Sequence, residues 1–445
     1  MTIGPVDRLH VWLDDHLGLR HVGILSRTRE SGFAYQSNVA FAYDRALRQE
    51  DAISLLMPVT NAPYTMPFAG MTHILPPVFD QNLPEGALRQ HLVTMFAKIV
   101  PDMGDFELLG LLGEARIGRI RVTQTPTPPS VMAAGGIDAT LLLRTPDSRP
   151  LMLALIEKLA KESNVSGVQP KVLARANVEH DAAVDRLTMT ADQLIVKSSG
   201  DDYPWLAVNE FLCMKAATAL GLRVPVVHLS EDQQVLVVEG FDFDHEGNAI
   251  GFEDMACLSA RMSNQRYEGS YEDVVQTIRD WVTPDYLPDA LDSFFAALVF
   301  NCAIENGDAH LKNFGLIYRD PTRSVALAPV YDLVCTTAYL REDQMALRLR
   351  GSSRFADRAA LERFGQEACG LERSEILLTF SKALMAIDDL SIQLANFSNA
   401  DATFEQECGN AMMASLVRGM RRTFGLGKDY FPSGYHLTLR ATRLD

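Results

Sequence analysis

The most informative stretch of this chain is residues 305–314, ENGDAHLKNF. They follow an apolar, helix-length segment that ends near Asn301, so we predict a loop at a helix end. Within the loop a carboxylate, Asp308, and an amide, Asn313, lie five positions apart. A loop of this length can present both side chains to one cleft. A chain of this size contains such a pair about once by chance, so a solvated loop with turn hydrogen bonds also fits.

The spacing of Asp308 and Asn313 is that of the catalytic base and the metal-binding asparagine in a protein-kinase catalytic loop. Asp332 lies nineteen positions after Asn313, in the apolar run APVYDLVC. A carboxylate in such a run is costly unless it is paired, hydrogen-bonded or bound to a metal. We therefore predict Asp332 as a second Mg²⁺ ligand. The alternative is a strand-terminal aspartate that caps the next turn.

Upstream residues could complete a nucleotide site. Lys197 ends the apolar strand QLIVK, where its ammonium could reach phosphates, and Glu210 on the next helix could pair with it. Residues Glu239 to Phe241 end the apolar stretch LVVEGF, in the position of an adenine-binding hinge. The alternatives are an edge-strand lysine that snorkels to water, a surface glutamate and an ordinary strand end.

The stretch from Val165 to Lys171 contains SGVQPK, in which Ser166 and Gly167 offer little bulk. Its backbone could approach phosphates. It lacks a Walker pattern and has only one glycine, which makes the motif alone a poor phosphate loop. His310 lies in the 305–314 loop without Cys or His neighbours in sequence, which argues against zinc.

Composition narrows the class of protein. In 445 residues, 57 Asp and Glu outnumber 41 Lys and Arg, for a net charge of −16, so binding to nucleic acid or anionic membrane through bulk charge is not expected. Hydrophobic residues make up 47 %, which excludes a mostly disordered chain. The six cysteines are scattered in apolar stretches, as in reduced cytosolic proteins. We expect neither a secretion signal nor a membrane span.

The fold class predicted from these patterns is an α/β first half followed by a mainly α second half. The Pro- and Gly-rich stretch 123–136 separates a β-rich module with helices, residues 1–122, from residues 137–243 and 244–445. The predicted elements are strands at 10–13 and 21–26, helices at 85–100, 106–113 and 151–162, strands at 187–189 and 193–197, a helix at 207–220, a strand at 235–239, and helices at 272–281, 289–301, 359–364, 375–394 and 404–424.

These motifs, in this order, resemble the HipA family of toxin kinases over nearly the whole chain. The most specific matches are GDAHLKNF at 307–314 and PVYDL at 329–333. They are preceded by SGVQPK, by the strand IVK, and by NEFLCMKAATALGLRVP at 209–225. VWLDDHLGLRHVGIL and LLGLLGEARIGRIRV are similar to the module that begins these proteins. No helix-turn-helix motif lies ahead of that module in the sequence, so we expect the antitoxin to be a separate protein.

The resemblance implies a two-lobed, protein-kinase-like HipA fold, with residues 137–243 completing the N-lobe and 244–445 forming the C-lobe. It implies phosphorylation of serine or threonine with ATP and Mg²⁺. By motif position Asp308 is the catalytic base and Asn313 and Asp332 hold the metal. The residues that would contact ATP are Lys197, Glu239, Phe241, Val165, Ser166, Gly167, Lys171 and His310, with Glu210 in support.

Family targets are aminoacyl-tRNA synthetases, notably the glutamyl enzyme, so the resemblance implies inhibited translation, growth arrest and persistence. It also implies a HipB-like helix-turn-helix antitoxin that carries the complex to operator DNA, in the cytoplasm and without a membrane. Two other functions stay open. One is a small-molecule kinase, and the other is a catalytically weak corepressor bound to the antitoxin.

One departure concerns self-phosphorylation. Some family members modify a serine three residues before the glycine of the phosphate loop, a position that Asn164 occupies here. Ser166 matches the serine used in relatives with an SGVQPK loop, and Ser163 is a second option. We predict autophosphorylation at Ser166.

Overall fold

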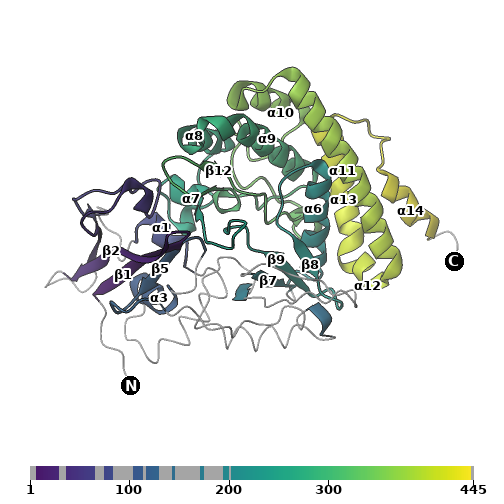
Figure 1. Cartoon of the computed structure of the whole chain (residues 1–445). Coiled ribbons are helices and arrows are strands. Elements are labelled where there is room, and N and C mark those ends of the chain that lie inside the picture. The colour runs from purple at the N-terminus through teal and green to yellow at the C-terminus, as the bar shows by residue number, and fades with distance from the viewer. Residues whose placement is uncertain are drawn as a thin grey trace. The chain divides into compact units, whose positions relative to one another are not determined.

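The computed structural model describes residues 7–29, 37–65, 75–83, 104–113, 117–129, 143–145, 171–174, 194–199 and 202–441 (Figure 1). The chain divides into two compact units, each described by itself. Unit 1 comprises 1–197, 237–265 and 315–325, and unit 2 comprises 198–236, 266–314 and 326–445. The three domains drawn from the sequence divide the chain differently and stay predictions.

Unit 1 contains a five-stranded sheet in the order β4-β3-β2-β1-β5 (Figure 1). Leu9, Val11 and Leu13 alternate along β1 and are fully buried, as expected for a strand with one face on a core. The tight turn into β2 uses Gly18 at a φ of 82°, a conformation that favours glycine. The strands predicted at 10–13 and 21–26 and the helix predicted at 106–113 are confirmed, whereas the helix predicted at 85–100 lies outside the described residues. The elements of this region are β1 (Arg8–Asp15), β2 (Gly18–Arg29), β3 (Ser37–Tyr43), β4 (Tyr64–Thr65), α1 (Pro77–Asp80), α3 (Asp105–Leu112) and β5 (Ile120–Thr123).

Two smaller sheets have the orders β6-β7-β9-β8 and β10-β11-β12. The strands predicted at 193–197 and 235–239 are confirmed as β7 and β9, whereas the strand predicted at 187–189 lies outside the described residues. Strands β10 to β12 are missing from the prediction. The bounds are β6 (Lys171–Ala174), β7 (Leu194–Ser198), β8 (Val227–Leu229), β9 (Val235–Glu239), β10 (Gly251–Asp254), β11 (Gly315–Tyr318) and β12 (Val325–Leu327), with α7 (Met255–Leu258) after β10.

Helices make up most of unit 2, and α9 (Leu287–Ala303) lies at their centre. From Phe294 to Ala303 every residue of α9 is buried, because α8 (Tyr271–Trp281), α11 and α13 pack around it. Helix α6 (Leu206–Leu220) ends at Gly221, whose φ of 99° provides the left-handed C-cap. The helices predicted at 207–220, 272–281, 289–301 and 359–364 are confirmed, the last as α10 (Arg358–Phe364).

The C-terminal helices differ in length from the prediction. Helix α11 (Arg373–Ala400) is longer than the predicted 375–394, and α14 (Ser433–Ala441) packs along it. The single helix predicted at 404–424 is wrong, because α12 (Ala402–Phe404), a π-helical turn (Glu405–Gly409) and α13 (Asn410–Phe424) share that stretch. The turn lies where Gly409 approaches α11. A Cβ on Gly409 would lie 2.4 Å from Ser398 Oγ.

All six cysteines are buried and free, as the sequence predicted. Burial raises the pKa of the Cys302 thiol to about 11 and that of Cys335 to about 12, so neither is a reactive thiolate near neutral pH. Of the helices in the described part of the chain, none combines the length and apolar composition that a bilayer crossing requires.

Candidate active site

The 305–314 loop joins α9 to β11 within a rigid setting. Helix α9 ends at Ala303 with Ile304 as its C-cap, and Glu305 turns the chain with a left-handed φ of 55°. The backbone N–H of Asn306 then donates to the Asn301 carbonyl at 2.9 Å, and Asn306 Nδ2 donates to Asn301 Oδ1 at 2.7 Å. Asn306 Oδ1 in turn accepts from the Asp308 N–H at 3.0 Å. These bonds fix the path of the chain into Asp308.

Glu305 anchors the start of the loop, with a side chain only 3 % exposed. Its carboxylate accepts from Arg418 Nη2 at 2.8 Å, Arg422 Nη1 at 2.9 Å and Thr337 Oγ1 at 2.9 Å. The sequence analysis did not identify this residue. The available signal was a glutamate at the end of a buried helix and two arginines four positions apart on one face of α13.

Position 307 requires glycine because the Asp343 carboxylate lies very close to its Cα. Its N–H donates to Thr336 Oγ1 at 2.8 Å, and that hydroxyl donates to Asp343 Oδ2 at 2.5 Å. A Cβ at position 307 would lie 2.1 Å from Asp343 Oδ2, so only glycine fits beside this carboxylate. Thr336 therefore connects the loop to the segment that follows Asp332.

Asp308 differs from its neighbours because its side chain is 53 % exposed. Tyr267 Oη donates to its Oδ1 at 2.8 Å. Burial, followed by the charge of Asp308, raises the pKa of Tyr267 to about 12, so the phenol remains a donor at neutral pH. His310 Nε2 lies 4.0 Å from the same oxygen, and the Tyr267 and His310 rings meet edge to face at 5.0 Å. A carboxylate in this setting can accept a proton from an incoming hydroxyl.

Asn313 and Asp332 come together as the sequence predicted. Asn313 Nδ2 donates to Asp332 Oδ2 at 2.9 Å, and Asn313 Oδ1 accepts from the His310 N–H at 3.0 Å. Asp332 has a left-handed φ of 61°, which is uncommon outside glycine and often marks a functional position. The neighbouring Tyr331 Oη donates to the Lys312 carbonyl at 2.7 Å and holds the two segments together.

This pair fits a magnesium ion by its donor chemistry. Mg²⁺ is bound in proteins by one or two carboxylates together with phosphate and water oxygens. The Asp332 carboxylate supplies such a ligand. Asn313 Oδ1 has a second lone pair beyond the one that accepts from His310. These two residues would hold the metal.

His310 has a local structural role in the described loop. Its Nδ1 accepts from the Lys312 N–H at 3.2 Å, which orients the ring with Nε2 toward Asp308. A neutral imidazole whose Nδ1 accepts carries its proton on Nε2. The contact with nucleotide that the resemblance implies for His310 stays a prediction.

The other predicted site residues lie on strands and helices outside the 305–314 loop, or outside the described residues. In unit 1, Lys197 of β7 pairs with Lys171 of β6 in the strand register, Glu239 ends β9, and the Phe241 ring packs edge to face on Phe252 at 5.6 Å. In unit 2, Glu210 lies on α6. Val165, Ser166 and Gly167 lie outside the described residues, as do Ser163 and Asn164.

The low exposure of Lys197 and Glu210 excludes the surface positions considered for them in the sequence analysis. The exposed fraction is 6 % for Lys197 and 2 % for Glu210, so they are neither a snorkelling edge lysine nor a surface glutamate. Strand β7 lies between β6 and β9 rather than at an edge. Buried charges of this kind need partners. Lys197 and Glu210 belong to different units, and their pairing stays a prediction.

Comparisons with known proteins agree with these motifs. Residues 9–123 match the family described as HipA N-terminal domain, and residues 163–390 match that described as HipA-like C-terminal domain. The protein named "Putative kinase Y4dM" of Sinorhizobium fredii is 29 % identical over 367 residues, which cover 77 % of this chain and 82 % of that protein. "Putative kinase Y4mE" of the same organism is 27 % identical over 369 residues, covering 77 % and 80 %.

A solved structure supports the fold. The HipA of Shewanella oneidensis MR-1, determined in complex with HipB and its operator DNA, aligns with a TM-score of 0.61 at 20 % identity. The alignment covers 93 % of this chain and 98 % of that one. The chain therefore has a HipA-like fold, in which sheets and helices are mixed as predicted. Its division into two lobes stays a prediction.

Proposed function

Because this chain belongs to the HipA family, we propose that it is the serine/threonine kinase toxin of a HipBA-like type II toxin–antitoxin system. One observation supports this most strongly: Asn313 Nδ2 lies 2.9 Å from Asp332 Oδ2, on the loop that also exposes Asp308. A loop of purely structural purpose gains nothing from an exposed carboxylate beside a half-buried amide–carboxylate pair. The two Sinorhizobium relatives, whose names describe kinases, support the same reaction class.

In the proposed reaction an acceptor hydroxyl attacks the γ-phosphorus of ATP, the bond to the β-phosphate oxygen breaks, and ADP leaves. Asp308 accepts the hydroxyl proton, and Tyr267 holds the carboxylate in place through its hydrogen bond. Mg²⁺, when bound, neutralises phosphate charge, with Asn313 and Asp332 as its protein ligands. Lys197 would bind phosphate oxygens. The protein thus acts by positioning and electrostatics.

We extend the proposal to target and partner through the family resemblance. The target would be an aminoacyl-tRNA synthetase such as the glutamyl enzyme, and its phosphorylation would inhibit translation in the cytoplasm. A HipB-like antitoxin would bind the kinase and supply the contacts to operator DNA. The net charge of −16 supports this division of labour, because the kinase itself repels DNA.

Labelled ATP tests the proposal. The purified chain is incubated with [γ-³²P]ATP and Mg²⁺, in one arm with a proteome extract and in another with a metabolite pool. We expect label on protein, mapped to serine or threonine, and none without Mg²⁺. Label in the metabolite arm alone would indicate a small-molecule kinase. Nucleotide binding without transfer in either arm would indicate a corepressor.

Autophosphorylation at Ser166 is a separate part of the proposal, which rests on the sequence alone. Mass spectrometry after incubation with MgATP should find phosphate on the peptide that contains Ser166. Phosphate found only elsewhere, including Ser163, would refute this assignment.

A further inference from the structure

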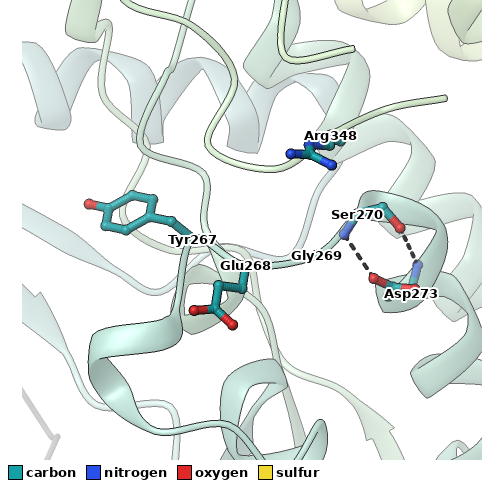
Figure 2. Close-up of a pocket in the computed structure, with 6 residues that line it drawn as sticks. All are labelled: Tyr267, Glu268, Gly269, Ser270, Asp273 and Arg348. Atoms are coloured by element: carbon teal, nitrogen blue, oxygen red, sulfur yellow. Dashed lines mark hydrogen bonds between the residues drawn. The ribbon is translucent and has the colours of Figure 1, made fainter. Parts of the chain in front are cut away.

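A hollow beside the 305–314 loop has no role in the reaction described so far. It lies in unit 2, has a volume of about 490 Å³, and is lined by Tyr267, Glu268, Gly269, Ser270, Asp273 and Arg348 (Figure 2). This volume falls in the range of sites that hold a ligand or a few side chains.

Residues 266–271, which include most of the residues that line the hollow, form hydrogen bonds with the loop that carries Asp308. Tyr267 Oη donates to Asp308 Oδ1 at 2.8 Å, and the Leu311 N–H donates to the Arg266 carbonyl at 3.1 Å. Tyr271 Oη also donates to the Ala309 carbonyl at 3.0 Å. Three hydrogen bonds thus link residues 266–271 to residues 308–311. The hollow therefore lies next to the loop that carries Asp308.

Arg348 is placed with similar rigidity. The Tyr271 N–H donates to its carbonyl at 2.9 Å, and its own N–H donates to the Gly269 carbonyl at 3.3 Å. Its neighbours Leu347 and Leu349 are buried whereas Arg348 is exposed, so the alternation of an extended chain directs this side chain outward. Figure 2 shows the guanidinium beside the hollow.

The three charged side chains that line the hollow, Glu268, Asp273 and Arg348, differ in their contacts and orientation. Asp273 Oδ2 accepts from the Ser270 N–H at 2.9 Å at the start of α8, where the helix dipole also stabilises a carboxylate. Figure 2 shows the Glu268 carboxylate on the opposite side of the backbone from the Arg348 guanidinium. Among the residues that the structure describes, Arg348 forms no ion pair, although the chain has an excess of acidic residues.

We propose that this hollow binds the acceptor polypeptide and that Arg348 selects an aspartate or glutamate near the acceptor hydroxyl. The inference rests on the proposed kinase function. Three peptide units, at most about 11 Å, separate the backbone of Tyr267 from that of Ser270, which forms a β-bridge with Arg348. Tyr267 reaches Asp308 through the end of its phenol, which lengthens the path from Arg348 to Asp308. An extended substrate therefore covers this path in more than three residues. Arginine binds a carboxylate through two parallel hydrogen bonds, which gives both affinity and selectivity.

The test uses the full chain and a serine peptide array in which each neighbouring position is fixed in turn as Asp, Glu, Ala or Lys. We expect the wild-type protein to prefer an acidic residue at one position, more than three residues from the serine, by about tenfold. Arg348→Glu should abolish that preference and favour Lys. Arg341→Glu is the matched control, because Arg341 is an exposed arginine on the same segment that does not line the hollow. It should behave as the wild type.

If peptides are too short to be accepted, the same comparison uses the protein that becomes labelled in the extract. Arg348→Glu should slow its labelling about tenfold, and replacement of the target's acidic neighbour by Lys should restore the rate. The inference falls if the mapped site has no acidic neighbour or if Arg348→Glu and Arg341→Glu act alike. In those cases transfer itself persists and the proposed kinase function stands. Absence of transfer to any acceptor would overturn both.

Discussion

The N-terminal sheet and the 305–314 loop use carboxylates in opposite ways. In the sheet, Asp15 has a side chain only 1 % exposed and accepts from Arg20 Nη1 at 2.6 Å and Arg119 Nη1 at 3.1 Å. Burial alone would raise the pKa of Asp15, but hydrogen bonds from Arg20 and the Leu17 N–H, with the charge of Arg119, lower it. In the loop, Asp308 is half exposed. A paired, buried carboxylate stabilises a fold, whereas an exposed carboxylate on a rigid loop can act on a substrate.

The same contrast occurs within the loop itself. Glu305 resembles Asp15, because two arginines bind it in the interior, and it lies only three positions before Asp308. We therefore expect Glu305 to stabilise the fold and Asp308 to take part in phosphoryl transfer. Variants of the two residues should separate these effects.

Asp308→Asn should have the largest effect on activity. The amide cannot accept the hydroxyl proton, so the rate of phosphoryl transfer should fall about 10²- to 10⁴-fold. The free energy of unfolding should change by less than about 0.5 kcal/mol, because the side chain is half exposed. Transfer of ³²P and urea unfolding measure the two quantities. Asp285→Asn, an exposed aspartate of unit 2, is the control and should change neither.

Glu305→Ala should have the largest effect on stability. It leaves the guanidinium groups of Arg418 and Arg422 without their buried partner, and the free energy of unfolding should fall by about 3–5 kcal/mol. Urea unfolding followed by circular dichroism measures the loss. A fall below about 1 kcal/mol would mean that the Glu305 network contributes little to the fold.

Thr336→Val should have an intermediate effect. The variant keeps the shape of the side chain but removes the hydroxyl that accepts from the Gly307 N–H and donates to Asp343. Loss of these part-buried hydrogen bonds should lower the free energy of unfolding by about 1–3 kcal/mol. The transfer rate should also fall, because the loop that holds Asp308 loosens. Thr336→Ser should retain both properties, and equal losses in both variants would contradict this role.

Glu253→Gln should have the smallest effect, visible only as a pH dependence. Burial raises the pKa of Glu253, and hydrogen bonds from Ser54, Leu55 and Tyr318 only partly offset this. Since the folded pKa lies above the unfolded value of about 4.3, the wild-type protein loses stability as pH rises from there through the folded pKa. The stability difference between variant and wild type should therefore shift in favour of Gln with increasing pH. Urea titrations at several pH values measure this shift, and a constant difference would contradict it.

Local signals in the sequence predicted much of this molecule. Gly221 marked the end of α6, and the alternation of apolar residues marked β1. Two short sequence motifs indicated that Asn313 and Asp332 share one site, and in the structure their side chains form a hydrogen bond. The roles of these residues in catalysis and metal binding remain proposals.

Contacts between residues far apart in the sequence could not be predicted from such local signals. Tyr267 lies 41 positions before Asp308, and only the tertiary fold brings its hydroxyl to that carboxylate. The strands β10 to β12 have three or four residues each, too few to show a period. In the π-helical turn before α13, Gly409 lies close to Ser398 of α11, a contact that helix periodicity does not encode.

Titration of nucleotide with and without metal tests the central claim most directly. Isothermal calorimetry would compare MgATP and metal-free ATP for the wild-type protein, Asp332→Asn and the control Asp285→Asn. The account predicts that Asp332→Asn weakens MgATP binding by at least about tenfold and leaves metal-free ATP binding nearly unchanged. Equal MgATP affinity in all three proteins would contradict the assignment of Asn313 and Asp332 to a magnesium–nucleotide site.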